Sequence, residues 1–134
     1  MSADQPEGTS PHVEYYPFPV KTSLPFSAAV RVGNLLFVSG QMGTNEKMEL
    51  IPGGIEKETK QAFANIKAIL ESHGSSLERV VRIHVVLADI ADMAEMDRVY
   101  REFFPVDPPA RTAWSMQLRF GNGCEIECIA LAGR

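Results

Sequence analysis

Residues 55–87, IEKETKQAFANIKAILESHGSSLERVVRIHVVL, contain a helical pattern followed directly by a strand pattern. In residues 55–73, apolar side chains recur at spacings of three and four, which predicts a helix with one apolar face. Gly74 suits the left-handed residue that ends such a helix. Residues 77–87 are rich in β-branched side chains and predict a strand. On this strand the side chains expected to share one face are Val81, Ile83, Val85 and Leu87.

Strand patterns lie on both sides of this stretch. Residues 28–32 and 35–40 flank Gly33-Asn34, a hairpin signal. Asp89 is placed to cap a second helix, whose apolar stripe runs from Met93 to Phe103 and which three prolines end. Residues 110–117 and 123–131 predict two closing strands, joined by a Gly-Asn-Gly turn at 121–123. The expected order is strand-strand-helix-strand-helix-strand-strand.

This order predicts an α+β fold, with a mixed sheet and two helices packed on one of its faces. Each helix has a single apolar face, so the second face of the sheet is left without cover. The apolar side chains expected there are Val86, Ile129 and Leu131. An uncovered apolar sheet face indicates oligomerisation.

Length and composition narrow the class of protein. The 134 residues fit one domain, expected over 17–134, behind a flexible polar tail at 1–16. A net charge of −4 argues against a dedicated nucleic-acid binder, which should show a basic face. No stretch has the ~18–20 apolar residues of a membrane span, and no signal peptide is apparent. A soluble, cytoplasmic protein without a membrane partner is expected.

Arg111 is the first candidate for chemistry, because it begins an otherwise uncharged stretch, 112–116. A guanidinium in apolar surroundings needs an anionic partner, and its planar fork suits a carboxylate. That carboxylate can belong to a substrate or to the protein itself. The sequence alone leaves both open and favours the internal salt bridge.

Glu125 and Glu127 are two apart in an apolar strand and therefore share a face. A partly desolvated carboxylate can move protons on a substrate or a water, and the alternative is a pairing with Arg or Lys. At the end of an earlier strand, Ser39 offers a hydroxyl and Gly40 allows close backbone approach, or the two simply form a strand exit.

Metal and thiol chemistry is not indicated. The three histidines and two cysteines have no metal-ligand spacing, so no metal or cofactor is expected. Cys124 and Cys128 are ~13 Å apart along one strand, too far for a disulfide, and are expected to be reduced.

Five short segments, in order and at compatible spacing, resemble the RidA/YjgF family of imine and enamine deaminases. They are PFSAAV at 25–30, VSGQ at 38–41, NIKAIL at 65–70, PART at 109–112 and EIECIA at 125–130. The resemblance implies a chorismate-mutase-like fold assembled as a homotrimer. Its three sheets would form an inner barrel with the helices outside, and its active sites would lie between subunits.

The resemblance also implies roles for individual residues. Arg111 corresponds to the arginine that binds the substrate carboxylate, and Glu125 to the glutamate that positions the attacking water. Ser39 and the backbone of Gly40 correspond to the strand-end loop of the pocket.

Four positions depart from the family pattern. Thr112 stands where the family has a serine. Asp97 stands where the family has a pocket asparagine. Phe26 stands where it usually has a tyrosine and therefore lacks the hydroxyl. Ala113 stands where a pocket cysteine is frequent.

The leading hypothesis is a cofactor-independent 2-iminobutanoate/2-iminopropanoate-type deaminase, which hydrolyses 2-aminoacrylate-type enamines and imines to 2-keto acids and ammonia. One alternative is a pathway-specific deaminase of a larger, aminomuconate-like enamine acid. Another is a non-catalytic trimer that binds a carboxylate metabolite. The acidic balance counts against the ribonuclease activity sometimes assigned to this family.

Overall fold

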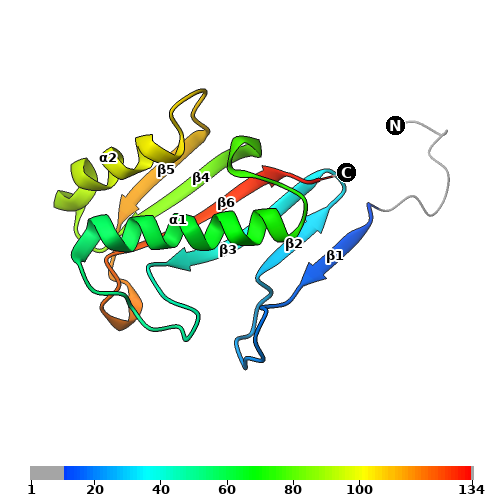
Figure 1. Ribbon diagram of the computed structural model, residues 1–134, viewed down its shortest axis with the longest axis horizontal. Coiled ribbons are helices and arrows are strands. Elements are labelled where there is room, and N and C mark those ends of the chain that lie inside the picture. The colour runs from blue at the N-terminus through cyan, green and yellow to red at the C-terminus, as the bar shows by residue number, and fades with distance from the viewer. Residues whose placement is uncertain (1–10, 134) are drawn as a thin grey trace.

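The computed structural model describes residues 11–133 as a six-stranded sheet with two helices packed on one face (Figure 1). The strands are β1 (Val13–Tyr16), β2 (Ala29–Val32), β3 (Leu35–Met42), β4 (Val80–Leu87), β5 (Ala110–Ser115) and β6 (Cys124–Leu131). The helices are α1 (Gly54–Ser72) and α2 (Met93–Phe103). The strand order is β1-β2-β3-β6-β4-β5, and only β4 and β5 run parallel. The predicted α+β fold is confirmed.

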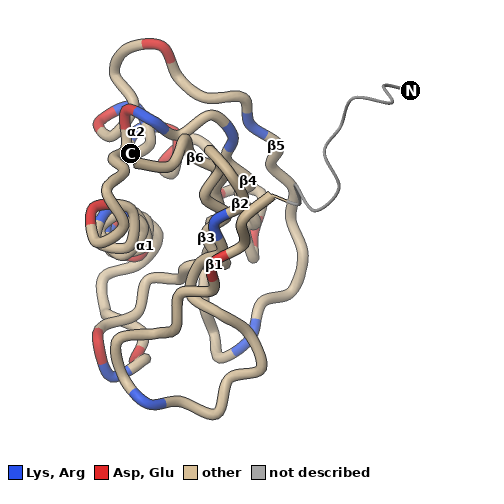
Figure 2. Tube along the Cα trace, turned by 90° about the vertical axis from the view of Figure 1, so that its right-hand side faces the viewer, with Lys and Arg blue, Asp and Glu red and all other residues tan. Residues whose placement is uncertain are grey.

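The hydrophobic core lies between the sheet and the helices. Figure 2 shows α1 on one side of the strands, where the alternate residues of β3, β4 and β6 that face it are buried. Phe63 of α1 is fully buried and contacts three aromatic rings at the C-terminal end of α2. Aromatic contacts of this kind contribute stability beyond the area they bury, so Phe63 links the two helices.

The local predictions around α1 and the first hairpin are confirmed. The helix ends at Ser72, and Gly74 has a φ of 77°. β2 and β3 pair antiparallel around Gly33, whose φ of 55° suits a tight turn. Asp89 caps a separate short 3₁₀ turn, Ile90–Asp92, by accepting a hydrogen bond from the Ala91 amide at 2.9 Å. The prediction that Asp89 caps the second helix itself is wrong by one turn.

The predicted pairing of the closing strands is wrong. β5 and β6 are not neighbours, because β4 lies between them. β6 pairs antiparallel with both β3 and β4, so its backbone groups are satisfied along both edges. β5 instead adds in parallel to the outer edge of β4 after the α2 crossover. The connection from β5 to β6 contains the 3₁₀ turn Arg119–Gly121 rather than a tight hairpin.

Two further differences are local. A register irregularity between Val80 and Arg82 buries Val80 and leaves Val81 exposed, so Val81 does not share the face of Ile83. The last four residues of the predicted tail, Val13–Tyr16, form β1 on the sheet edge, while residues 1–10 lie outside the described part.

The face of the sheet opposite the helices is partly apolar. Leu35, Phe37, Trp114 and Leu131 are exposed large hydrophobic residues of this face. Ile129 is half-buried there, whereas Val86, which pairs in register with Glu125 and Trp114, is buried. No helix within residues 11–133 is long and apolar enough to cross a membrane.

Candidate active site

Arg111 lies near the start of the edge strand β5 and reaches toward α2. Its Nη1 donates to Asp97 Oδ1 at 2.6 Å, and its guanidinium carbon lies 4.8 Å from the centre of the Tyr100 ring. Asp97 and Tyr100 are three residues apart on α2 and therefore share a helix face. The side chains of Arg111 and Asp97 are 27% and 26% exposed, so the pair is reachable from solvent.

The internal salt bridge that the sequence favoured for Arg111 is therefore present, with Asp97 as the partner. This salt bridge does not use all five N–H donors of the guanidinium. Within residues 11–133, the hydrogen bond to Asp97 is the one bond that the Arg111 side chain makes. The Asp97 carboxylate and the Tyr100 ring hold the guanidinium in place. Its other N–H donors stay available to a ligand. Ala113 follows on the same face of β5 and packs against the core.

Tyr100 is a site neighbour that sequence reasoning assigned only to the apolar stripe of the second helix. Burial raises the pKa of its hydroxyl, which has no hydrogen-bond partner within the described residues. Its proximity to Arg111 depends on how α2 lies over β5, which no local pattern reveals.

Glu125 lies on β6, on the sheet face opposite the helices. A Cβ added to Gly40 would lie 2.9–3.0 Å from the Cδ, Cγ and Oε1 atoms of Glu125. With the Glu125 side chain in this position, a residue larger than glycine at position 40 would require the carboxyl group to move. The predicted approach of the Gly40 backbone to a ligand stays a prediction. The predicted strand exit at Ser39 and Gly40 is wrong, because β3 continues to Met42 and the two residues lie at its register irregularity, between Val38 and Gln41. Ser39 Oγ donates to the Ser27 carbonyl at 2.7 Å and so ties this irregular part of β3 to the loop before β2.

Phe26 lies in that same loop, one residue before Ser27. Phe26 is 44% exposed, and its ring meets that of Phe18 edge-on at a centroid distance of 5.6 Å. The Ser27–Ser39 hydrogen bond therefore links the Phe26 loop to the part of β3 that carries Gly40. Phe26, Ser39, Gly40 and Glu125 form one group, which we call the loop–strand group.

The chain does not bring this group to Arg111. Along β4, Arg111 pairs with Ile83 and Glu125 pairs with Val86. Ile83 and Val86 are three residues apart, which is about 10 Å along the strand. In addition, β4 lies between β5 and β6. The two side chains also leave opposite faces of the sheet. A site that uses both Arg111 and Glu125 requires two copies of the chain.

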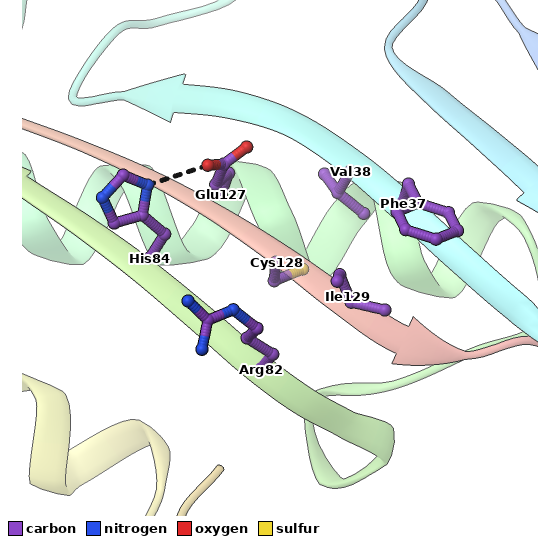
Figure 3. Close-up of a pocket in the computed structure, with 7 residues that line it drawn as sticks. All are labelled: Phe37, Val38, Arg82, His84, Glu127, Cys128 and Ile129. Carbon is purple, nitrogen blue, oxygen red and sulfur yellow. Dashed lines mark hydrogen bonds and ion pairs between the residues drawn. The ribbon is translucent and has the colours of Figure 1, made fainter. Parts of the chain in front are cut away.

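Glu127 has a different partner from the one predicted. Its Oε1 lies 2.8 Å from Nδ1 of His84, and Figure 3 shows the two side chains pointing toward one another across β6 and β4. The alternative of an Arg or Lys partner is wrong because β6 inserts beside β4. The pair borders a small pocket of the open sheet face together with Arg82 and Phe37.

Glu58 was not recognised from the sequence. This α1 carboxylate is 7% exposed, and its Oε1 accepts a hydrogen bond from the Gly123 amide at 2.7 Å. It thereby anchors the start of β6, two residues before Glu125. Its position in the helical pattern gave only a weak signal, since an acid on the buried side of a helix requires a partner.

Both cysteines are free, as predicted, and both are buried. Burial raises the pKa of each thiol, Cys124 and Cys128, to about 12. A protonated thiol is a poor nucleophile, so neither supplies covalent chemistry at neutral pH.

Known proteins resemble this chain along most of its length. A family model described as Endoribonuclease L-PSP matches residues 19–132. A RutC family protein of Pyrococcus abyssi is 47% identical over 109 residues, covering 81% of this chain and 85% of its own. The 2-iminobutanoate/2-iminopropanoate deaminase of Bos taurus is 40% identical over 111 residues, covering 81% of each chain.

Solved structures share the fold. RidA from an Antarctic Psychrobacter superposes with a TM-score of 0.78 at 38% identity, covering 87% of this chain and 94% of its own. The YjgF gene product of E. coli gives 0.77 at 29% identity, covering 87% and 93%. The family match over residues 19–132, the identities and the common fold together show that this chain belongs to the RidA/YjgF family.

Proposed function

We propose that this protein hydrolyses small enamine and imine carboxylates of the 2-aminoacrylate type to 2-keto acids and ammonia. This is the activity of a cofactor-independent 2-iminobutanoate/2-iminopropanoate-type deaminase, the name borne by mammalian relatives about 40% identical to this chain. One observation carries the proposal: a reachable guanidinium, Arg111, is held by Asp97 and Tyr100 and keeps further donors available. Such a fork suits a substrate carboxylate.

The active site would form between two copies of the chain in a homotrimer. One copy contributes Arg111, with Ala113 beside it, and its neighbour contributes the loop–strand group with Glu125. The separation of Arg111 and Glu125 on opposite sheet faces supports this arrangement, and so does the exposed apolar surface of the open face.

The chemistry follows from these groups. The enamine first tautomerises to the imine, whose carboxylate binds Arg111. The water oxygen forms a bond to the imine carbon, the C=N π electrons move to nitrogen, and the carboxylate of Glu125 accepts a proton from the water. Glu125 then returns that proton to the nitrogen. The carbinol hydroxyl then passes its proton to the departing nitrogen as C=O forms, the C–N bond breaks, and the products are a 2-keto acid and ammonia.

Positioning and electrostatics are enough for this reaction, because such imines are already reactive toward water. Phe26 has no hydroxyl and therefore moves no proton. A ribonuclease function is less well supported, since a chain of net charge −4 has no overall attraction for a phosphate backbone.

The test is ammonia release from 2-aminoacrylate generated enzymatically in the assay. We expect Arg111→Ala to lower kcat/KM by about 10²-fold or more, because the carboxylate loses its charge-assisted hydrogen bonds. Arg98→Ala is the matched control, since the ion pairs that Arg98 makes within residues 11–133 are with the partly exposed Glu56 of α1 and Glu102 of α2. Equal rates for the wild type and Arg111→Ala would refute the proposal. Binding of a keto acid without any turnover would favour a carboxylate-binding protein instead.

A further inference from the structure

Asp97 changes the charge of the candidate site. Its carboxylate lies 2.6 Å from the guanidinium that is proposed to bind substrate, and the two groups are about equally exposed. Any carboxylate that docks on the free donors of Arg111 also approaches a second carboxylate. The net charge of the pair is zero, so a simple anion gains much less there than at an isolated arginine.

The substrate and the product differ in the atom that is double-bonded to the carbon beside their carboxylate. In a protonated imine this atom is a nitrogen that carries positive charge and N–H donors. In the 2-keto acid it is a carbonyl oxygen, which can only accept hydrogen bonds. This atom is two bonds from the carboxylate carbon, and Asp97 Oδ1 is only 2.6 Å from Arg111 Nη1. A substrate whose carboxylate binds Arg111 would therefore bring this atom close to the Asp97 carboxylate.

We propose that Asp97 is a specificity-determining residue that favours the zwitterionic iminium acid over the anionic keto acid. This inference rests on the proposed function of the Arg111 site. The carboxylate of Asp97 accepts a hydrogen bond from the iminium nitrogen and repels the keto oxygen. Favouring the iminium form also favours the more electrophilic species, and disfavouring the keto acid promotes release of product.

Two ligands with one carbon skeleton separate this role from a purely structural one. 2-Oxobutanoate carries only the carboxylate, whereas 2-aminobutanoate adds an ammonium group that stands in for the iminium nitrogen. Asp97→Asn keeps an oxygen that can accept from Arg111 but removes the negative charge. Binding of both ligands is measured by titration calorimetry on the assembled wild-type and variant proteins.

We expect opposite shifts. In Asp97→Asn, the Kd of 2-oxobutanoate should fall about 5- to 10-fold and that of 2-aminobutanoate should rise by a similar factor, as expected for one charge in a partly exposed pair. The kcat/KM for the imine should fall, and inhibition by the keto acid should become stronger. Glu95→Gln, an exposed acid on the same helix, should change neither ligand.

The competing explanation is that Asp97 only holds Arg111 in position. Both Kd values would then rise together, or neither would change, and either result overturns the inference. Calorimetry does not depend on turnover, so the selectivity of Asp97 and the deaminase function can be refuted independently of one another. Opposite shifts without catalysis would refute the deaminase function and support the selectivity of Asp97, whereas catalysis with parallel shifts would do the reverse.

Discussion

Replacing Gly40 with alanine is expected to damage catalysis while leaving the fold almost unchanged. The added Cβ would lie 2.9 Å from Cδ and 3.0 Å from Cγ and Oε1 of Glu125. Carbon atoms in comfortable contact are about 3.5–4.0 Å apart, so the carboxyl group has to move by about 0.6–1 Å. The neighbouring atoms belong to a flexible side chain at the open face of the sheet, which can yield.

Two opposing effects set the change in stability. Displacing the Glu125 side chain from its preferred rotamer costs about 0.5–1.5 kcal/mol. Removing a glycine from a strand recovers about 0.5–1 kcal/mol of backbone entropy. The free energy of unfolding should therefore change by about 1 kcal/mol or less. A misplacement of about 1 Å in a catalytic group, by contrast, can lower the rate about 10²-fold.

The assay is a double-mutant cycle on ammonia release, with urea unfolding in parallel. Gly40→Ala should lower kcat/KM about 10²-fold in the wild-type background and have almost no further effect in Glu125→Ala. Glu127→Gln is the control, because Glu127 lies on the same face of β6 as Glu125 but pairs with His84. A loss that is equally large in the Glu125→Ala background would show that Gly40 does not act through Glu125 and would refute the reasoning.

Four further predictions concern stability and thiol chemistry. Phe63→Ala should lower the free energy of unfolding by about 3–5 kcal/mol, because it empties a fully buried aromatic site between α1 and α2, and a loss under about 1 kcal/mol in urea unfolding would contradict the packing. Glu58→Ala should cost about 1–3 kcal/mol by leaving the Gly123 amide without its acceptor, whereas Glu58→Gln should retain most of the stability. Burial raises the pKa of Cys124 and Cys128 from 9.0 to about 12, so both thiols should resist iodoacetamide in the folded protein at neutral pH and react once it is unfolded. Because the folded state favours the protonated thiols, stability should be full below pH 9 and fall as the pH rises toward 12, which urea unfolding across that range would detect.

Patterns of short range were the predictable part of the fold. The helix over 55–73 follows from spacings of three and four, and Gly33 indicates the β2–β3 hairpin because few other residues adopt its backbone conformation. The error over the closing strands arose because pairing across a sheet is a long-range choice. Nothing near residues 121–123 indicates that β6 inserts between β3 and β4. The bulge that exposes Val81 is likewise set by pairing with β6.

The sequence by itself determined that Arg111 needs an anion, since the stretch after it is uncharged, and that Glu125 and Glu127 share a strand face. It also determined the family, because five ordered motifs are specific together. Only the tertiary structure decided that the anion within the chain is Asp97, that Gly40 makes room for Glu125, and that Arg111 and Glu125 lie on opposite faces of one sheet. The physical reason is that a side chain's own neighbours set its face and its need for a partner, whereas the partner's identity depends on which distant strands and helices pack together.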